Sequence, residues 1–135
     1  MNKPLQRIEP AALAPKPGYS QVMVCEPGTL AFIAGQLPED AQGKLVGDDD
    51  IHAQMAQVFK NTELALASVG CGFEHIAKFT LYMRDLSQIT VFREVRDHYI
   101  KPGQQPACTS LEVSRFHDDR FLVVLESIAR VPHPF

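Results

Sequence analysis

Apolar side chains recur at every third or fourth position between residues 51 and 69, a spacing that predicts an amphipathic helix. A second segment, residues 87–100, has the same period and also predicts a helix. The apolar run at residues 76–83 between them reads as a strand that is buried on both sides at its centre. Strand-like segments precede and follow the two helices, so the order predicts an α+β sandwich with two helices packed on one face of a mixed sheet.

Three consecutive aspartates at positions 48–50 precede the first helix, and Gly70 and Gly72 follow it. Asp50 is the expected N-cap, because a carboxylate there can accept a hydrogen bond from a free backbone N–H of the first turn. The neighbouring carboxylates suit the positive end of the helix dipole, and glycine commonly follows the last turn. A calcium site would need the alternating oxygen ligands of an EF-hand loop, which the sequence lacks. We therefore interpret the aspartate run as a helix cap.

The remaining segments predict short strands and an extended arm, all within a single domain over residues 1–135. Residues 1–17 contain four prolines and little periodicity, which favours an extended N-terminal arm lying on the domain. Runs of β-branched and apolar residues predict further strands, of which the first two and the last two are expected to form hairpins. These strands are expected at residues 22–25, 29–34, 44–46, 106–115 and 123–129.

The balance of charge argues against a nucleic-acid partner. The chain has 135 residues and a formal net charge of −3, and its lysines and arginines form no run. Binding a nucleic acid requires a clustered basic surface that displaces counterions. No segment has the length of a membrane span, and the polar, proline-containing N-terminus does not resemble a signal peptide. We expect a cytoplasmic protein with neither a membrane nor a nucleic-acid partner.

The three cysteines, Cys25, Cys71 and Cys108, are an odd number and form no Cys-x-x-Cys pair. Reduced thiols in a cytoplasmic protein are the simplest interpretation. No cysteine and histidine pair has the spacing of metal ligands, and no His-Glu-x-x-His helix occurs. The five histidines are therefore expected at the surface or in turns, and neither a metal nor another cofactor is predicted.

Four segments carry a resemblance to a known family. Gly-Tyr-Ser-Gln at 18–21, Ile-Ala-Gly-Gln-Leu-Pro at 33–38 and the segment 76–86 occur in the family's order. The fourth is residues 106–115 together with Val-Val-Leu-Glu-Ser-Ile-Ala at 123–129. Together they span nearly the whole chain and resemble the RidA family, also called YjgF or L-PSP, whose members are small trimers that hydrolyse reactive imines and enamines.

The resemblance implies a chorismate mutase-like fold with a six-stranded mixed sheet, assembled as a homotrimer with ligand clefts between neighbouring subunits. In the usual family sequence an arginine follows Pro-Ala and grips the substrate carboxylate, but here that position is Cys108. The glutamate that helps to position the attacking water corresponds to Val124. Neither side chain can replace the usual one, so the resemblance implies a divergent member that lacks the substrate-binding arginine.

Other cleft positions leave alternatives open. Glu126 lies on the same strand face as Val124, displaced by roughly 7 Å, or two strand rises. It either replaces the missing carboxylate or forms an ion pair across strands or subunits. The resemblance also places Tyr19 and Gly35 at the cleft, where the Tyr19 hydroxyl either binds a ligand or caps the interface. Arg93 occupies a position that is commonly an asparagine facing the cleft.

Arg93 has two interpretations: it binds a ligand, or it is a solvated arginine paired with Glu94, Asp97 or another subunit. Strand alternation places Cys108 and Ser110 on one strand face, which in the family lines the cleft. A thiol can act as a nucleophile when a neighbour lowers its pKa, but the sequence offers no local partner. A neutral thiol lining the cleft is therefore the favoured interpretation of Cys108.

These residues lead to two expectations for function. The first is a hydrolase of the deaminase type, acting on a small imine, enamine or related reactive metabolite other than the standard 2-imino acids. The second is a non-catalytic trimer that binds a small metabolite. A third class, a ribonuclease or translation inhibitor, is disfavoured by the acidic balance of charge. Activity on a panel of imines and enamines separates the first two.

Overall fold

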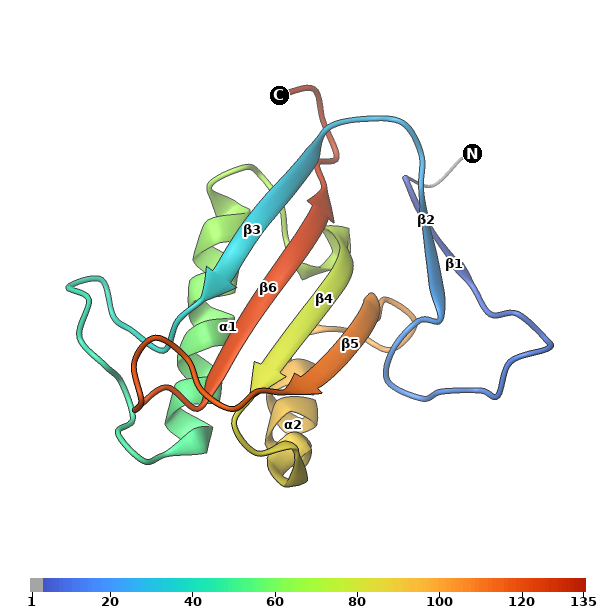
Figure 1. Cartoon of the computed structure of the whole chain (residues 1–135). Helices are drawn as coiled ribbons and strands as arrows, with labels where there is room; N and C mark the ends of the chain where they lie inside the picture. The colour runs from blue at the N-terminus through green and yellow to red at the C-terminus, as the bar shows by residue number, and fades with distance from the viewer. Residues whose placement is uncertain (1–3) are drawn as a thin grey trace.

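The computed structural model describes residues 4–135, in which two helices cover one face of a sheet (Figure 1). The sheet has four strands, β3 (Leu30–Gln36), β4 (Ile76–Met83), β5 (Ala107–Glu112) and β6 (Val123–Arg130). They lie in the order β3-β6-β4-β5, and only the β4–β5 pair is parallel. Helices α1 (Ile51–Ala67) and α2 (Ile89–Tyr99) pack on the same face. The predicted α+β architecture with two helices on a mixed sheet is confirmed.

The six strands are divided between two sheets. β1 (Leu5–Ile8) pairs antiparallel with β2 (Val22–Cys25) in a separate two-stranded ribbon beside the β5 edge (Figure 1). One isolated parallel bridge, between Ser20 and Ala107, connects the segment before β2 to the start of β5. The predicted N-terminal arm therefore contains a strand, because β2 supplies hydrogen-bond partners for its backbone.

The two predicted hairpins are wrong. The segments 22–25 and 29–34 do not pair, because β2 pairs with β1 and β3 pairs with β6. β5 and β6 are not neighbours either, because β4 lies between them and pairs with both. A parallel pair needs a crossover, which α2 supplies between β4 and β5. The expected strand at 44–46 is reduced to one bridge between Glu39 and Leu45.

The helix layer buries one face of β4. Phe79, Leu81 and Met83 are fully buried, whereas the alternate side chains are partly exposed on the other face. The expectation that β4 is buried on both sides is therefore wrong for the single chain, because no helix covers the second face. At the start of α1, the Asp50 carboxylate accepts a hydrogen bond from the Ala53 N–H at 3.1 Å, which confirms the predicted cap.

An aromatic cluster joins both helices to the sheet. Phe59 of α1 is fully buried, and its ring centroid lies 5.3–6.1 Å from those of four other rings. These rings belong to Phe73, Phe79, Phe92 and Tyr99. Phe73 comes from the short 3₁₀ helix η1 (Phe73–His75), Phe79 from β4 and the other two from α2. The cluster therefore sets the position of α2 relative to the sheet.

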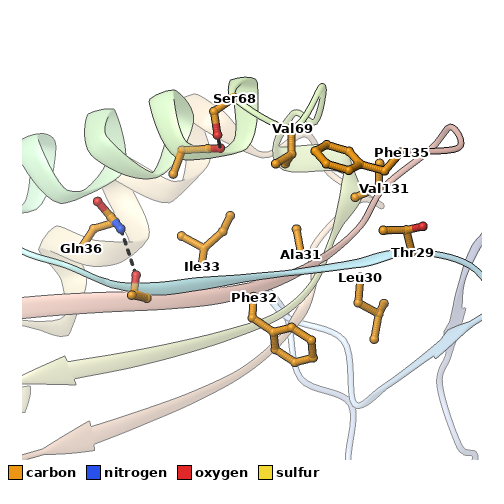
Figure 2. A pocket seen from close by; sticks show the side chains of 12 residues that line it. Thr29, Leu30, Ala31, Phe32, Ile33, Gln36, Ser68, Val69, Val131 and Phe135 are labelled. Atoms are coloured by element: carbon orange, nitrogen blue, oxygen red, sulfur yellow. Dashed lines mark hydrogen bonds between the residues drawn. The ribbon is translucent and has the colours of Figure 1, made fainter.

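The sheet face opposite α1 and α2, called the open face below, is uncovered in the single chain. Figure 2 shows Leu30 and Phe32 of β3 pointing away from α1, whereas Ala31 and Ile33 point toward it. Phe32 lies within the paired part of β3, and its side chain is 74% exposed because no other element covers the open face above it. Among residues 4–135, no helix combines the length and apolar character that crossing a membrane requires.

Candidate functional site

A pocket of about 260 Å³ lies between α2 and β5 at the edge of the sheet. Four residues singled out from the sequence line it, namely Tyr19, Arg93, Cys108 and Ser110. The other lining residues are Pro17, Leu86, Ile89 and Arg96. This α2–β5 pocket thus contains one tyrosine hydroxyl, two guanidinium groups, a thiol and a serine hydroxyl around an apolar wall.

The register of β5 explains why Cys108 and Ser110 reach this pocket. Cys108 lies opposite Phe79 and Ser110 opposite Leu81 in the parallel pair. Residues directly opposite each other share a sheet face, so both polar side chains lie on the helix side. β5 is an edge strand, and there the layer of helices ends and leaves the pocket.

Two carboxylates hold the segment that leads into α2. The short 3₁₀ helix η2 (Leu86–Gln88) begins after Asp85, whose Oδ1 accepts hydrogen bonds from the Ser87 N–H and hydroxyl. These hydrogen bonds lower the pKa of the Asp85 carboxyl. Glu112, at the end of β5, accepts a hydrogen bond from the Leu86 N–H at 3.0 Å. The contacts anchor η2 to β5 and so place Arg93, one turn into α2, at the pocket wall.

The opposite wall is held by a buried serine. Ser20 is 1% exposed, its N–H donates to the Pro106 carbonyl at 3.0 Å, and its hydroxyl donates to the Gln105 carbonyl. These bonds attach the segment 17–20 to the start of β5. Tyr19, the residue before Ser20, is thereby placed beside Cys108 in the pocket lining.

The environment of Cys108 favours a neutral thiol. Burial raises the pKa of the thiol, and the hydrogen bond with Ser110 and the positive charges of Lys78 and Arg96 offset this only in part. The Cys108 sulfur and the Ser110 hydroxyl oxygen lie 4.0 Å apart. Since nucleophilic attack needs the thiolate, the arrangement supports the interpretation of Cys108 as a neutral residue of the pocket wall.

The two arginines of the pocket differ in their partners. Arg93 is exposed, and within residues 4–135 it makes no ion pair with Glu94 or Asp97. Asp97 pairs instead with Arg96, whose Nη2 lies 3.0 Å from the Asp97 Oδ1. Sequence analysis did not identify Arg96 as a site residue. Its position three residues after Arg93 was the available signal, because residues i and i+3 of a helix are neighbours on its surface.

The other three predicted site residues, Gly35, Val124 and Glu126, lie outside the α2–β5 pocket. Val124 and Glu126 alternate with the fully buried Val123 and Leu125 of β6, so they belong to the open face. Within one chain the predicted cleft is therefore two separate groups of residues on opposite faces of the sheet.

Glu126 makes a hydrogen bond across strands within the single chain. Its Oε1 accepts a hydrogen bond of 2.6 Å from the Tyr82 hydroxyl on the neighbouring strand β4. This hydrogen bond, with burial and the carboxylate charge, raises the pKa of Tyr82. Both residues line the open face, where the Lys78 ammonium also donates to the Thr109 hydroxyl.

Gly35 lies where the register of β3 against β6 shifts, between Ile33 and Gln36. A Cβ atom at Gly35 would lie 2.6 Å from Cγ1 of Val124, closer than side-chain atoms can approach. Because Gly35 has no side chain, the backbone of β3 can lie close to the Val124 side chain of the neighbouring strand β6. Gly35 also lines a hollow of about 680 Å³ that includes Lys60 and Asn61.

A third hollow, of about 380 Å³, lies between β3 and α1 (Figure 2). None of its twelve lining residues is charged, and Figure 2 shows Ile33, Val69 and Phe135 among them. Within the described chain, no three His, Cys, Asp or Glu side chains converge so that they could hold a metal ion. The α2–β5 pocket is therefore the candidate site, because charged and hydrogen-bonding groups converge there in an apolar setting.

Comparison with known proteins gives four similarities. Residues 9–131 match the family described as Endoribonuclease L-PSP. A RutC family protein of Pyrococcus abyssi is 34% identical over 118 residues, which cover 86% of this chain and 90% of the relative. The human 2-iminobutanoate/2-iminopropanoate deaminase is 25% identical over 105 residues, which cover 78% of this chain and 72% of the human protein.

The fourth similarity is to a solved structure, that of YyfB from Yersinia pestis, a protein of unknown function of the conserved Rid family. It has a TM-score of 0.87 at 22% sequence identity and covers 95% of this chain and 99% of the other. At that identity the similarity concerns the fold. The segment matched by the family, residues 9–131, includes all eight residues that line the α2–β5 pocket.

Proposed function

This chain belongs to the Endoribonuclease L-PSP family, and on that premise we propose that it is a hydrolase of the deaminase type. The proposed substrate is a small imine, enamine or related reactive metabolite other than the standard 2-imino acids. The human relative named 2-iminobutanoate/2-iminopropanoate deaminase supports the reaction class. The observation that supports the change of substrate is the α2–β5 pocket, which is lined by Arg93 and by Cys108, the residue at which the resemblance implies an arginine in other members.

The proposed reaction needs little from the protein beyond positioning. The oxygen of water adds to the electrophilic imine carbon, and the resulting carbinolamine loses ammonia, so that a C=N bond is replaced by a C=O bond. Holding the two reactants together contributes several kcal/mol, about 7 kcal/mol or more in well-oriented systems. Tyr19 and Ser110 supply hydroxyl groups that can orient the imine nitrogen or the water, and Ile89 helps to exclude bulk solvent.

Cys108 changes how a carboxylate can be held. A guanidinium is always charged and can form two parallel hydrogen bonds to a carboxylate, whereas a neutral thiol offers neither. Losing such a charge-assisted contact costs about 1.5–3 kcal/mol, which is roughly a 10- to 100-fold loss of affinity. Arg93, on the facing helix, is then the group proposed to hold the anionic end of a substrate in a shifted position.

We predict low activity on 2-iminopropanoate and 2-iminobutanoate, because Cys108 leaves their carboxylate without its usual partner. The measurement is ammonia release when an amino-acid oxidase generates these imines in the assay. Cys108→Arg is expected to raise the rate roughly 10-fold or more. Cys25→Arg is the matched control, because Cys25 is exposed on β2 away from the pocket. High activity of the unaltered protein on these two imines would contradict the proposed role of Cys108.

A second prediction concerns Arg93. Arg93→Ala is expected to weaken the binding of a small monocarboxylate such as butanoate by roughly 10-fold, because it removes a charge-assisted hydrogen bond. Isothermal titration calorimetry gives the affinity, and light scattering checks that the assembly is unchanged. Arg115→Ala serves as the control, since Arg115 is an exposed arginine outside the pocket. Equal losses in the two variants would show that Arg93 acts only through the net charge.

The proposed assembly is a homotrimer with clefts between subunits. Two observations support it: the open face carries an exposed Phe32, and the predicted cleft residues lie on opposite faces of the sheet. A cleft shared by two subunits would bring the α2–β5 pocket of one chain toward the Gly35 and Val124 region of the next. Exposed apolar side chains on an uncovered sheet face, as at Leu30 and Phe32, favour association because they otherwise promote aggregation.

The alternative, a trimer that binds a small metabolite without turning it over, has one observation in its favour. Val124 provides no carboxylate to orient water, and the Glu126 carboxylate is already bound to the Tyr82 hydroxyl. A panel of imines and enamines with ammonia detection decides between the two. Binding of a small anion together with the absence of turnover across the panel would establish the alternative. Nuclease activity, which the family description suggests, is disfavoured by the net charge of −3.

A further inference from the structure

Arg96 is a second cation of the α2–β5 pocket, and the structure holds it in place. The side chain is only 12% exposed, and its guanidinium carbon lies 5.8 Å from the centre of the Phe92 ring. Its Nε and Nη2 both donate to the Asp97 Oδ1, at 3.1 and 3.0 Å. Its charge acts on the Cys108 thiol at the other wall of the pocket. The guanidinium is therefore held by a cation–π contact with Phe92 and by the Asp97 carboxylate, and Arg96 belongs to the lining of the pocket.

Gly18 makes room for this guanidinium. Its φ of +93° is a backbone conformation that other residues rarely adopt, and a Cβ there would lie 2.8 Å from Nη1 of Arg96. The ion pair with Asp97 uses Nε and Nη2, so Nη1 is left without a hydrogen-bond acceptor among residues 4–135. An arginine that is packed, oriented and still has a free donor is well prepared to receive an oxygen atom of a ligand.

The residues that line the pocket include two arginines and no acidic residue. The two arginines are Arg93 and Arg96, and Asp97 lies outside the lining. The two arginines are neighbours on one helix face, where like charges repel each other. One carboxylate can satisfy the Arg93 guanidinium through two hydrogen bonds, so a ligand with a single carboxylate leaves the Nη1 of Arg96 without an acceptor. The volume of about 260 Å³ lies just below the usual range of ligand pockets, so the ligand is small.

From the two arginines in the lining of this small pocket we infer that the substrate carries two carboxylates, one held by Arg93 and the other by Arg96. The inference rests on the proposed function, which makes the substrate a 2-imino dicarboxylate. Its hydrolysis consumes one water and gives a 2-oxo dicarboxylate and ammonia. Selectivity over monocarboxylic imines then comes from Arg96, because Arg93 would hold the first carboxylate of either kind of substrate.

Stable acids of equal chain length test the binding part of the inference. By calorimetry we expect succinate to bind at least 10-fold more tightly than butanoate, and glutarate more tightly than pentanoate. Arg96→Gln should remove that preference by weakening only the dicarboxylates, whereas Arg115→Gln should leave it unchanged. Equal affinities for succinate and butanoate would overturn the inference, and so would a preference that survives Arg96→Gln. Tighter binding of inorganic phosphate than of succinate would also overturn it. That result would mean that both guanidinium groups bind one dianionic group and not two separate carboxylates.

Turnover separates this inference from the proposed function. Ammonia release is measured with imines of dicarboxylic and of monocarboxylic amino acids, generated in the assay. Faster hydrolysis of the dicarboxylic imine, lost in Arg96→Gln, supports both statements. Hydrolysis of both imines without any preference for dicarboxylates would overturn the inference and leave the proposed function standing. Selective binding of succinate without hydrolysis of any imine would sustain dianion recognition by Arg96 and overturn the proposed function.

Discussion

A protein with glutamate in place of Phe32 is expected to be a monomer of 15.0 kDa, whereas the unaltered chain is expected to form a trimer of about three times that mass. Phe32 projects from the open face and is 74% exposed in the single chain (Figure 2). Covering a phenylalanine contributes about 1.5–3 kcal/mol in each subunit, and a carboxylate there would instead have to be desolvated. Light scattering and sedimentation at several protein concentrations measure the outcome.

Leu13→Glu is the matched control for this prediction. Leu13 is 50% exposed in the segment between β1 and β2 and lines none of the pockets described above, so the charge should leave the assembly intact. Circular dichroism checks that both variants are folded. If Phe32→Glu remained a trimer, the open face would not be the contact between subunits. A monomeric unaltered protein would contradict the proposed trimer itself.

Replacing Phe59 with alanine is expected to lower the free energy of unfolding by about 3–5 kcal/mol. Phe59 is fully buried and contacts four rings from η1, β4 and α2, so the surrounding groups cannot collapse into the space without moving a whole helix. A typical domain has only about 5–15 kcal/mol of stability in total, so this single change removes a large part of it. Denaturant titration at a fixed protein concentration is the measurement, because assembly adds to the apparent stability.

The same helix offers an internal control. Leu64→Ala removes an exposed side chain five residues further along α1 and should change the stability by less than about 0.5 kcal/mol. A loss of under about 1 kcal/mol in Phe59→Ala would show that the aromatic cluster does not hold α2 against the sheet. In that case the wall of the α2–β5 pocket would depend mainly on the contacts of Asp85 and Glu112.

The parts of the fold that were predictable are those whose signal is local. The period of residues 51–69 and the Asp50 cap predicted α1, and the structure begins this helix at Ile51 and ends it at Ala67. The predicted strand 76–83 coincides with β4. Strand partners were not predictable in the same way. The turn residues before β3 show that the chain changes direction there, but they do not show that β3 pairs with β6.

Buried polar contacts were also beyond the sequence. Gln54 is fully buried in α1, donates to the carbonyls of Gly47 and Arg120, and accepts a hydrogen bond from the Leu122 N–H. It therefore attaches the loop before β6 to the helix layer. A glutamine in a periodic segment gives no sign of such a role, because its partners come from loops 7 and more than 60 residues away.

The candidate site shows the same division. Tyr19, Arg93, Cys108 and Ser110 were identified through the family resemblance, and the structure brings them together in one pocket. Arg96 was missed although it lies three residues after Arg93; the room that Gly18 leaves for its guanidinium is visible only in the structure. The site residues on β6 could not be assigned to a sheet face relative to β5 until the strand order was known.

The position of β6 also has a consequence for how fast the protein folds. β6 follows all other strands in the chain, yet it lies between β3 and β4 (Figure 1). Leu30 pairs with Arg130, so a loop of about 100 residues must close before β3 gains a partner, and such non-local pairing slows folding. Until then β3 and β4 present free edges to other chains. The sheet that carries the α2–β5 pocket is thus complete only after β6 has joined it, although β6 contributes no side chain to the pocket.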